Sequence, residues 1–552
     1  MHEWVVDDMN IQIPLGKQAI YTASVTYAEG ETAVLTLGDA ELFAAGGGCL
    51  RLCGSRVRGE YAPGTYGVCV TINSVNQLVM VEVTLIDGGT LRRGTFALLG
   101  GDMICWSVTA EGAVTREAVC FTDAVREENE AVVRESYEGV YNLVTSFDDA
   151  CTTRLFAWTA ADSFVQGQDG MVLRYRAMGE TAWRQVDARH PDQMAPNPGE
   201  VYFKADLTGL MADTEYEYKL CLRGAENGEG ESGIYTFRTA PAEVGDFSFV
   251  AVGDTQGDSL AGEYILCQIA LERALREAGD AAFMLNTGDI THAGSNLCMW
   301  NWQFAAMAEF APSLPHFAAV GNHDTWGDVR NNYFSLHFNH PHNGAGALDR
   351  HMTDRITNHY LRVQADHAED TVYSFDYGRA HFTVLHSGSY VPEDEYMLEA
   401  QREWLIRDLE ASKGARWRII MVHEPVYHRK GDGEARPWLH DVIEAYGVDL
   451  VLQGHSHLVS RTYPMKDGRI VTKTSPDHIR KGAGTVYTTI GATSLYHDPM
   501  GDNTVEEYML IATPEERQAT YTVVSVGANR LVMTVKQLDG LIVDRFTIQD
   551  EE

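Results

Sequence analysis

The spacing of hydrophobic and polar residues changes character along the chain. Residues 1–137 carry short apolar runs, such as 33–37 and 78–83, separated by glycine-rich turns. Residues 138–241 alternate apolar and polar positions more regularly, with Trp158 early and a tyrosine-rich strand late. Both patterns are typical of strands. We therefore predict a β-rich accessory module over 1–137 and an immunoglobulin- or fibronectin-like sandwich over 138–241.

From residue 242 to 552 apolar strands alternate with amphipathic helices. The helix expected after the strand at 247–253 carries Tyr264, Cys267, Leu271 and Leu275 on one face. Further strands are predicted at 281–286, 317–320, 382–385, 417–422 and 448–452, helices at 395–412 and 437–446, and more strands within 484–546. This rhythm predicts an α/β layered domain, in which loops at the strand ends hold the functional groups.

Five short polar motifs follow apolar strands in this last domain. They are Gly253-Asp254-Thr255-Gln256, Asn286-Thr287-Gly288-Asp289-Ile290-Thr291-His292, Gly321-Asn322-His323-Asp324, Met421-Val422-His423-Glu424-Pro425 and Gly454-His455-Ser456-His457. One Gly-Asp after a strand is usually a turn, and a lone histidine is usually structural. Five such motifs in order, each where a strand ends, indicate one shared site.

The residue types in these motifs suit a pair of metal ions. Two cations held close together repel, so a carboxylate must bridge them, and Asp289 is the natural bridge. Asp254 adds negative charge to one ion. The imidazoles of His423, His455 and His457 and the amide of Asn322 suit iron, zinc or manganese. The motifs therefore predict a binuclear metal site.

Composition narrows the choice of partners. The chain has 78 acidic and 43 basic residues, for a formal charge of −35, which disfavours nucleic-acid backbone and anionic membranes. No apolar run is long enough to span a membrane, and the N-terminus lacks the features of a secretory signal. We expect a cytoplasmic protein, or a secreted one if a leader has been removed. Nothing in the pattern indicates the oligomeric state.

The motifs and their order resemble the calcineurin-like metallophosphoesterases, and most of all the purple acid phosphatase branch. Arg461-Thr462-Tyr463-Pro464 and Tyr373-Ser374-Phe375-Asp376-Tyr377-Gly378 add to the resemblance, which covers about residues 150–546. It implies a four-layer αββα catalytic domain behind a fibronectin-like sandwich. It also implies Asp254, Asp289 and His457 at one metal, and Asp289, Asn322, His423 and His455 at the other. His323 would be a general acid that Asp324 orients.

Two positions depart from the family pattern at the first metal. His292 stands where purple acid phosphatases have a tyrosine that binds ferric iron, and Gln256 stands where the wider superfamily often has histidine. Either residue could complete that metal's ligands. Without the phenolate, we expect no violet colour. Six histidines between 337 and 367 lie where a loop could cover the site.

The function that follows is hydrolysis of a small-molecule phosphate ester by a metal-bound hydroxide, with monoesters favoured by the resemblance. Phosphodiesters or nucleotides are the alternative on the same metal core. A non-catalytic binding or scaffold protein with a relic phosphoesterase domain is the alternative from another class.

Overall fold

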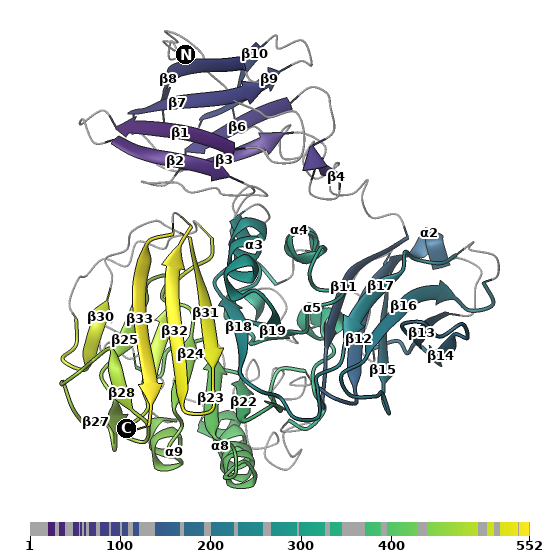
Figure 1. Ribbon diagram of the computed structural model, residues 1–552, viewed down its shortest axis with the longest axis vertical. Coiled ribbons are helices and arrows are strands. Elements are labelled where there is room, and N and C mark those ends of the chain that lie inside the picture. The colour runs from purple at the N-terminus through teal and green to yellow at the C-terminus, as the bar shows by residue number, and fades with distance from the viewer. Residues whose placement is uncertain are drawn as a thin grey trace.

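The computed structural model describes residues 139–550 except 166–169, 192–199, 226–229, 258–265, 295–296, 326–331, 345–369, 388–394, 428–438, 495–504, 513–518 and 539; before residue 139 it describes only the course of ten strands. Figure 1 shows three parts along the chain: the early strands, a sandwich and a larger layered domain. No helix in the described part is long and apolar enough to cross a membrane.

The early strands form two antiparallel four-stranded sheets and a short hairpin. One sheet has the order β2-β1-β7-β8, formed by β2 (Thr32–Gly38), β1 (Ile20–Tyr27), β7 (Leu78–Asp87) and β8 (Thr90–Leu99). The other has the order β10-β9-β6-β3, formed by β10 (Val114–Cys120), β9 (Asp102–Val108), β6 (Tyr66–Ile72) and β3 (Gly48–Cys53). The hairpin pairs β4 (Arg56–Val57) with β5 (Glu60–Tyr61). This part is β-rich, as predicted.

The second part is a sandwich of two antiparallel sheets. The first sheet contains β11 (Val140–Ser146), β12 (Arg154–Ala161) and β15 (Glu200–Leu207). The second contains β14 (Arg184–Asp187), β13 (Met171–Ala177), β16 (Glu215–Leu222) and β17 (Tyr235–Arg238), and the short helix α2 (Asp162–Val165) follows β12. Trp158 stacks on Phe203, and Tyr216 stacks on Phe237, within the core between the sheets.

Two seven-stranded sheets build the third part. The first has the order β20-β19-β18-β31-β32-β33-β28: β20 (His316–Ala318), β19 (Ala281–Asn286), β18 (Phe247–Val252), β31 (Thr520–Val526), β32 (Arg530–Gln537), β33 (Ile542–Gln549) and β28 (His478–Arg480). The second has the order β21-β22-β23-β24-β29-β25-β30: β21 (Tyr373–Tyr377), β22 (Ala380–Leu385), β23 (Trp417–Val422), β24 (Leu450–Gln453), β29 (Val486–Ile490), β25 (Val459–Thr462) and β30 (Met509–Ala512). A hairpin of β26 (Met465–Lys466) and β27 (Arg469–Ile470) follows β25.

The described helices of this part lie on the outer faces of these two sheets, between the layered domain and the sandwich, or in the site itself. They are α3 (Leu266–Ala278), α4 (Leu297–Met307), α5 (Asn332–His337), α8 (Glu395–Ala411) and α9 (His440–Ala445), together with the single turn η2 (His323–Thr325). Helix α3 packs against β18 and β31, whereas α8 and α9 pack on the second sheet. Helix α4 contacts α3 and β11, and α5 contacts β12 and β15. The arrangement of helix, sheet, sheet and helix confirms the predicted layers.

Successive side chains along a strand point to opposite faces of its sheet, and the apolar residues on the inner faces explain why the two sheets stack. Phe249 and Ala251 of β18 face the core between the sheets, where Phe249 stacks on Phe283. Val250 and Val252 are also buried and point to the opposite face, where α3 lies. On α3, Cys267 and Leu271 are buried as predicted, whereas Leu275 is half-buried and Tyr264 lies outside the described residues.

A buried ion pair joins the two sheets. Arg461 of β25 is fully buried, and its Nε and Nη2 lie 2.6 and 2.8 Å from the two carboxylate oxygens of Asp544 on β33. The guanidinium also donates to the carbonyl of Pro476 at 2.7 Å. Such bidentate pairs fix geometry as well as charge.

We expect Arg461→Met to lower the free energy of unfolding by about 3–5 kcal/mol, because Asp544 would remain buried without its partner. Urea unfolding followed by tryptophan fluorescence measures the loss. The double variant Arg461→Met/Asp544→Leu should recover most of it. A single variant as stable as the wild type would contradict this account of the pair.

A buried histidine ties β22 to α8. His381 Nδ1 lies 2.8 Å from Asp376, and its Nε2 lies 2.9 Å from Asp408. Burial alone would lower the pKa of His381, but the hydrogen bonds to the two carboxylates outweigh it and raise the pKa to about 9. A raised pKa stabilises the fold fully below the unfolded value near 6.5, and this stabilisation is lost as pH rises through about 9.

His381→Gln should therefore cost on the order of 1–3 kcal/mol at pH 6, and the difference from the wild type should shrink by pH 10. Melting temperatures of both proteins between pH 6 and 10 test this. A difference that stays constant over that range would show that the charge on His381 is not responsible.

Candidate metal centre

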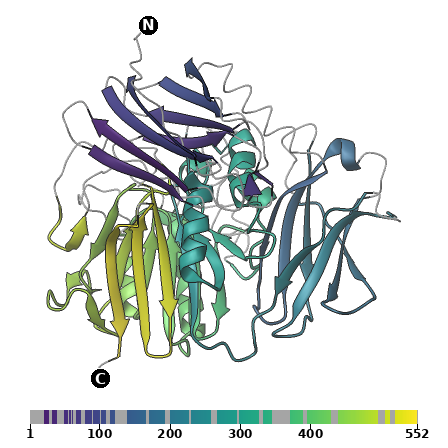
Figure 2. The ribbon, with the colours of Figure 1, turned by 45° about the horizontal axis from the view of Figure 1, so that its top comes forward.

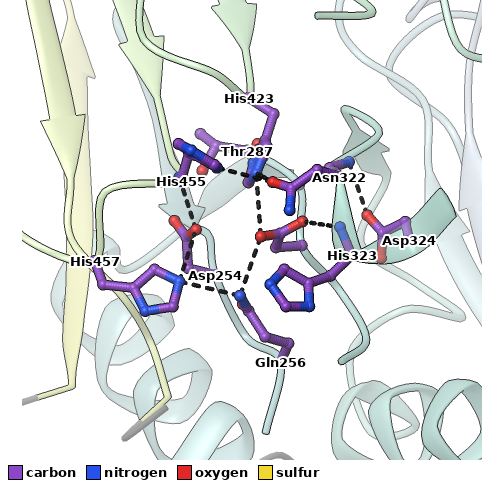
Figure 3. A network of polar contacts seen from close by, with 12 residues as sticks. Asp254, Gln256, Thr287, Asn322, His323, Asp324, His423, His455 and His457 are labelled. Carbon is purple, nitrogen blue, oxygen red and sulfur yellow. Dashed lines mark hydrogen bonds and ion pairs between the residues drawn. The ribbon is translucent and has the colours of Figure 1, made fainter. Parts of the chain in front are cut away.

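The five predicted motifs meet at one end of the two stacked sheets. The first three follow β18, β19 and β20 of one sheet, and the other two follow β23 and β24 of the other sheet. β18, β19 and β20 run parallel to each other, and so do β23 and β24, so their carboxyl ends share an edge. Figure 3 shows the side chains from these loops pointing toward one another.

Glycines and an unusual backbone let the loops come this close. A Cβ on Gly321 would lie 2.1 Å from the backbone nitrogen of Asp289, and one on Gly288 would lie 2.7 Å from His423 Nδ1. Four residues of the site adopt a positive φ that side chains disfavour: Asp254 (49°), Asp289 (51°), His455 (70°) and His457 (51°). Strain of this kind persists where the surroundings enforce it, as at functional sites.

Asp289 is the centre of the cluster. Its Oδ1 accepts the backbone N–H of His323 at 2.8 Å, and its Oδ2 lies 3.2 Å from His423 Nε2. His423 Nδ1 lies 2.9 Å from the carbonyl of Thr287, an arrangement that turns Nε2 toward the site. A backbone carbonyl leaves no signal in the sequence, so this contact of Thr287 could not be predicted.

Two groups of potential ligands share Asp289. Asp289, His423 and His455 bring ligand atoms within 4.8 Å of one another, and so do Asp254, Asp289 and His457. The Oδ1 atom of Asn322 lies 3.1 Å from His423 Nε2 and 2.8 Å from His455 Nδ1, so Asn322 joins the first group. The structure thus brings together the residues that the resemblance divides between two metals; that they bind metal stays a prediction.

The charges of the cluster fit bound cations. Asp254 is fully buried, and its Oδ2 has no hydrogen-bond partner among the described residues. Burial and the charge of Asp289 raise the pKa of Asp254 to about 7. Burial would likewise raise the pKa of Asp289, but His423 outweighs it and holds this pKa below its usual range. A metal cation would allow both carboxylates to ionise, and carboxylate, imidazole and amide ligands suit iron, zinc or manganese.

Gln256 reaches the centre, whereas His292 joins neither ligand group. Gln256 Nε2 lies 3.0 Å from both Asp289 Oδ2 and His457 Nε2, and its Oε1 is buried without a partner in the described part of the chain. The amide of Gln256 therefore directs its nitrogen toward the ligand groups, and a 180° flip of the amide would direct its oxygen there instead. The ring of His292 lies 5.1 Å from that of His323. The geometry thus places His292 beside the expected general acid.

The predicted role of Asp324 needs correction. Its carboxylate accepts backbone N–H groups of Ile290, Thr291 and Gly321 at 2.9–3.0 Å, which fastens the second and third loops together. His323 Nδ1 instead lies 2.9 Å from the carbonyl of His292. A buried carboxylate satisfies the nearby amide hydrogens first, because unsatisfied buried N–H groups are costly. The carbonyl of His292 therefore orients His323.

The histidine-rich stretch 337–367 does not cover the site where it is described. His337 and His340 are buried, and they pack against Trp300 and Tyr373 respectively. Burial lowers their pKa values to about 4 and about 3, so both rings are neutral near pH 7. Of the other four histidines, His342 contacts Arg189. The remaining three, His351, His359 and His367, lie outside the described residues.

Comparison with known proteins assigns the domain that carries this site to a superfamily. Residues 247–459 match the family model of the calcineurin-like phosphoesterases, and with the fold and the ordered motifs this part of the chain belongs to that superfamily. Within it, the chain is similar to the purple acid phosphatases. It is 32% identical over 290 residues to purple acid phosphatase 18 of Arabidopsis thaliana, which covers 50% of this chain and 56% of that protein.

Other relatives extend the comparison. A protein of Arabidopsis thaliana named "Probable inactive purple acid phosphatase 27" is 23% identical over 53% of this chain and 49% of its own length. The chain spans about half the length of the curated relatives it matches. The structure of a purple acid phosphatase from yellow lupin seeds shares the fold, with a TM-score of 0.60 and 14% identity over 91% of this chain and 96% of that one.

We expect Asp289→Asn to reduce bound metal from two ions to less than one per chain, because the shared carboxylate serves both groups. His455→Ala should leave about one ion. Metal analysis of the purified variants by mass spectrometry measures this. His292→Ala is the matched control and should keep two ions; loss of metal from it would restore His292 as a ligand.

Proposed function

We propose that the chain hydrolyses phosphate esters, with monoesters preferred, at a binuclear metal centre. The observation that carries the proposal is the convergence of Asp254, Asp289, Asn322, His423, His455 and His457 into two groups that share Asp289. Metal ions held by these residues would activate water and neutralise charge on the phosphoryl oxygens. Iron, zinc and manganese all suit this set of ligands.

His323 is suited to supply the proton that the leaving oxygen needs. His323 is buried, with 8% of the residue exposed, and its Nδ1 is directed to the carbonyl of His292. With Nδ1–H donating to that carbonyl, Nε2 is the atom that can pass a proton to the ester oxygen. The backbone of His323 is fixed by Asp289, so the imidazole keeps its place relative to the ligands.

The name of one relative, purple acid phosphatase 18, supports a phosphatase. Another relative is named as probably inactive, so the activity of this chain has to be measured. The preference for monoesters rests on this likeness. The alternative from another class, a binding protein with a relic domain, is disfavoured because every residue of the two expected ligand sets is present and assembled.

The test is hydrolysis of p-nitrophenyl phosphate and of its bis-ester with Mn²⁺, Zn²⁺ or iron added separately. We expect faster turnover of the monoester, no violet colour with iron, and a loss of 10²–10⁴-fold in kcat for His323→Ala with metal content unchanged. A faster bis-ester would favour the phosphodiesterase alternative. No turnover of either ester with any metal would contradict the proposal.

A further inference from the structure

A large cleft lies at the opposite edge of the sheets from the metal centre. Its volume is about 1030 Å³, and its walls come from the end of β17, the linker 239–246 and the beginnings of β18 and β19. It therefore runs between the sandwich and the layered domain, at the amino ends of the strands whose carboxyl ends carry the metal ligands. Clefts between domains are common places for small molecules to bind.

One wall of the cleft contains a buried arginine that has no carboxylate partner among the residues that the structure describes. Arg154, the first residue of β12, is 3% exposed. Its Nη2 donates to the carbonyl of Arg238 at 2.7 Å, and its guanidinium lies 4.7 Å from the centre of the Phe237 ring. Its Nε and Nη1 have no hydrogen-bond partner among the described residues.

A buried, uncompensated charge is costly, and two other buried basic residues in the described part of the chain have a carboxylate partner. Arg461 pairs with Asp544, and Lys204 lies 2.5 Å from Asp370. Burial lowers the pKa of Arg154 to about 10, and among the described residues the side chains of Tyr218 and Tyr377 oppose this shift. Arg154 stays charged near pH 7 and lacks the counter-charge that the other two have.

The rest of the cleft favours an anion with an apolar body. Arg530 and Arg545 line it and make no ion pair within the described residues. Four carboxylates also line the cleft. Asp213 forms an ion pair with Arg238 at 2.8 Å, and Asp246 accepts a backbone N–H. The other two are Glu215 and Asp280. Val244, Phe247 and Tyr377 add a half-buried apolar surface.

We propose that this cleft binds a small organic anion, whose carboxylate or phosphate group pairs with Arg154 while its apolar part lies along Val244, Phe247 and Tyr377. An arginine binds a carboxylate or a phosphate by donating two parallel N–H hydrogen bonds, and the bound anion would supply the missing counter-charge. The site is separate from the metal centre, so the proposal does not depend on the function proposed above.

The experiment measures the melting temperature of the full chain with increasing benzoate, phenyl phosphate, acetate or inorganic phosphate. We expect benzoate or phenyl phosphate to raise it in a saturable way, more than acetate or inorganic phosphate do. Benzoate against phenyl phosphate distinguishes the two head groups. Phosphates can also bind at the metal centre, but that contribution is the same in variants of the cleft.

Arg154→Met should abolish the shift with benzoate and reduce the shift with phenyl phosphate to the part that comes from the metal centre. Without ligand it should melt no lower than the wild type, because the buried charge is gone. Arg154→Lys keeps the charge and should weaken binding at least tenfold. Arg184→Met, an exposed residue paired with Glu180, is the control and should behave as the wild type. Hydrogen exchange of the wild type should slow over 236–247 on binding. Equal shifts in wild type and Arg154→Met, or no shift and no protection over 236–247 with any of the anions, would overturn the proposal.

Discussion

Two buried carboxylates held side by side are the constraint on which the layered domain and its candidate metal centre depend. Asp254 and Asp289 are fully enclosed where the two sheets meet, and both have a positive φ. Like charges in a dry site are unfavourable unless cations or hydrogen bonds compensate them. The surroundings compensate part of this negative charge. His455 and His323 donate backbone N–H groups to the two carboxylates, and imidazoles surround them. The strain and burial are understandable as preparation for metal ions, because without cations this cluster would oppose folding.

The candidate site draws its residues from both sheets, so its geometry depends on how the two sheets stack. Asp254, Asp289 and Asn322 follow strands of one sheet, whereas His423, His455 and His457 follow strands of the other. A shift of one sheet over the other would separate the two halves of each ligand group. The aromatic core between the sheets and the pair of Arg461 with Asp544 resist such a shift. Arg461, which the sequence marks only as a companion of the family motifs, thus has a structural role away from the candidate metal ligands. Figure 2, turned forward from Figure 1, shows the two sheets of this layered domain beside the smaller sandwich.

The sequence predicted the layers and the meeting of the five motifs because both follow from short-range rules: strand periodicity, and the gathering of parallel strand ends at one edge. It did not predict contacts that involve the backbone. The sequence suggests that Asp324 contacts the imidazole of His323. In the structure its carboxylate instead accepts three backbone N–H groups from two loops. His292 looked like a substitute ligand, yet its side chain lies by His323. The burial of Arg154 was equally invisible, because a strand that begins with arginine normally exposes it. The domain boundaries remain predictions.

The sandwich is more than a neighbour of the layered domain. Phe147, from the loop after β11, packs edge-on to Phe317 and Phe375 inside the core between the sheets. Lys204 of β15 is buried against Asp370, which precedes β21. These contacts put an apolar residue and a charge of the sandwich in the interior of its neighbour, where losing either would be costly. The two parts should therefore unfold together rather than move as bodies on a hinge. The cleft that contains Arg154 lies along this same junction, so an anion bound there would stabilise the joint itself, and the early part of β18 that leads to Asp254 forms one of its walls.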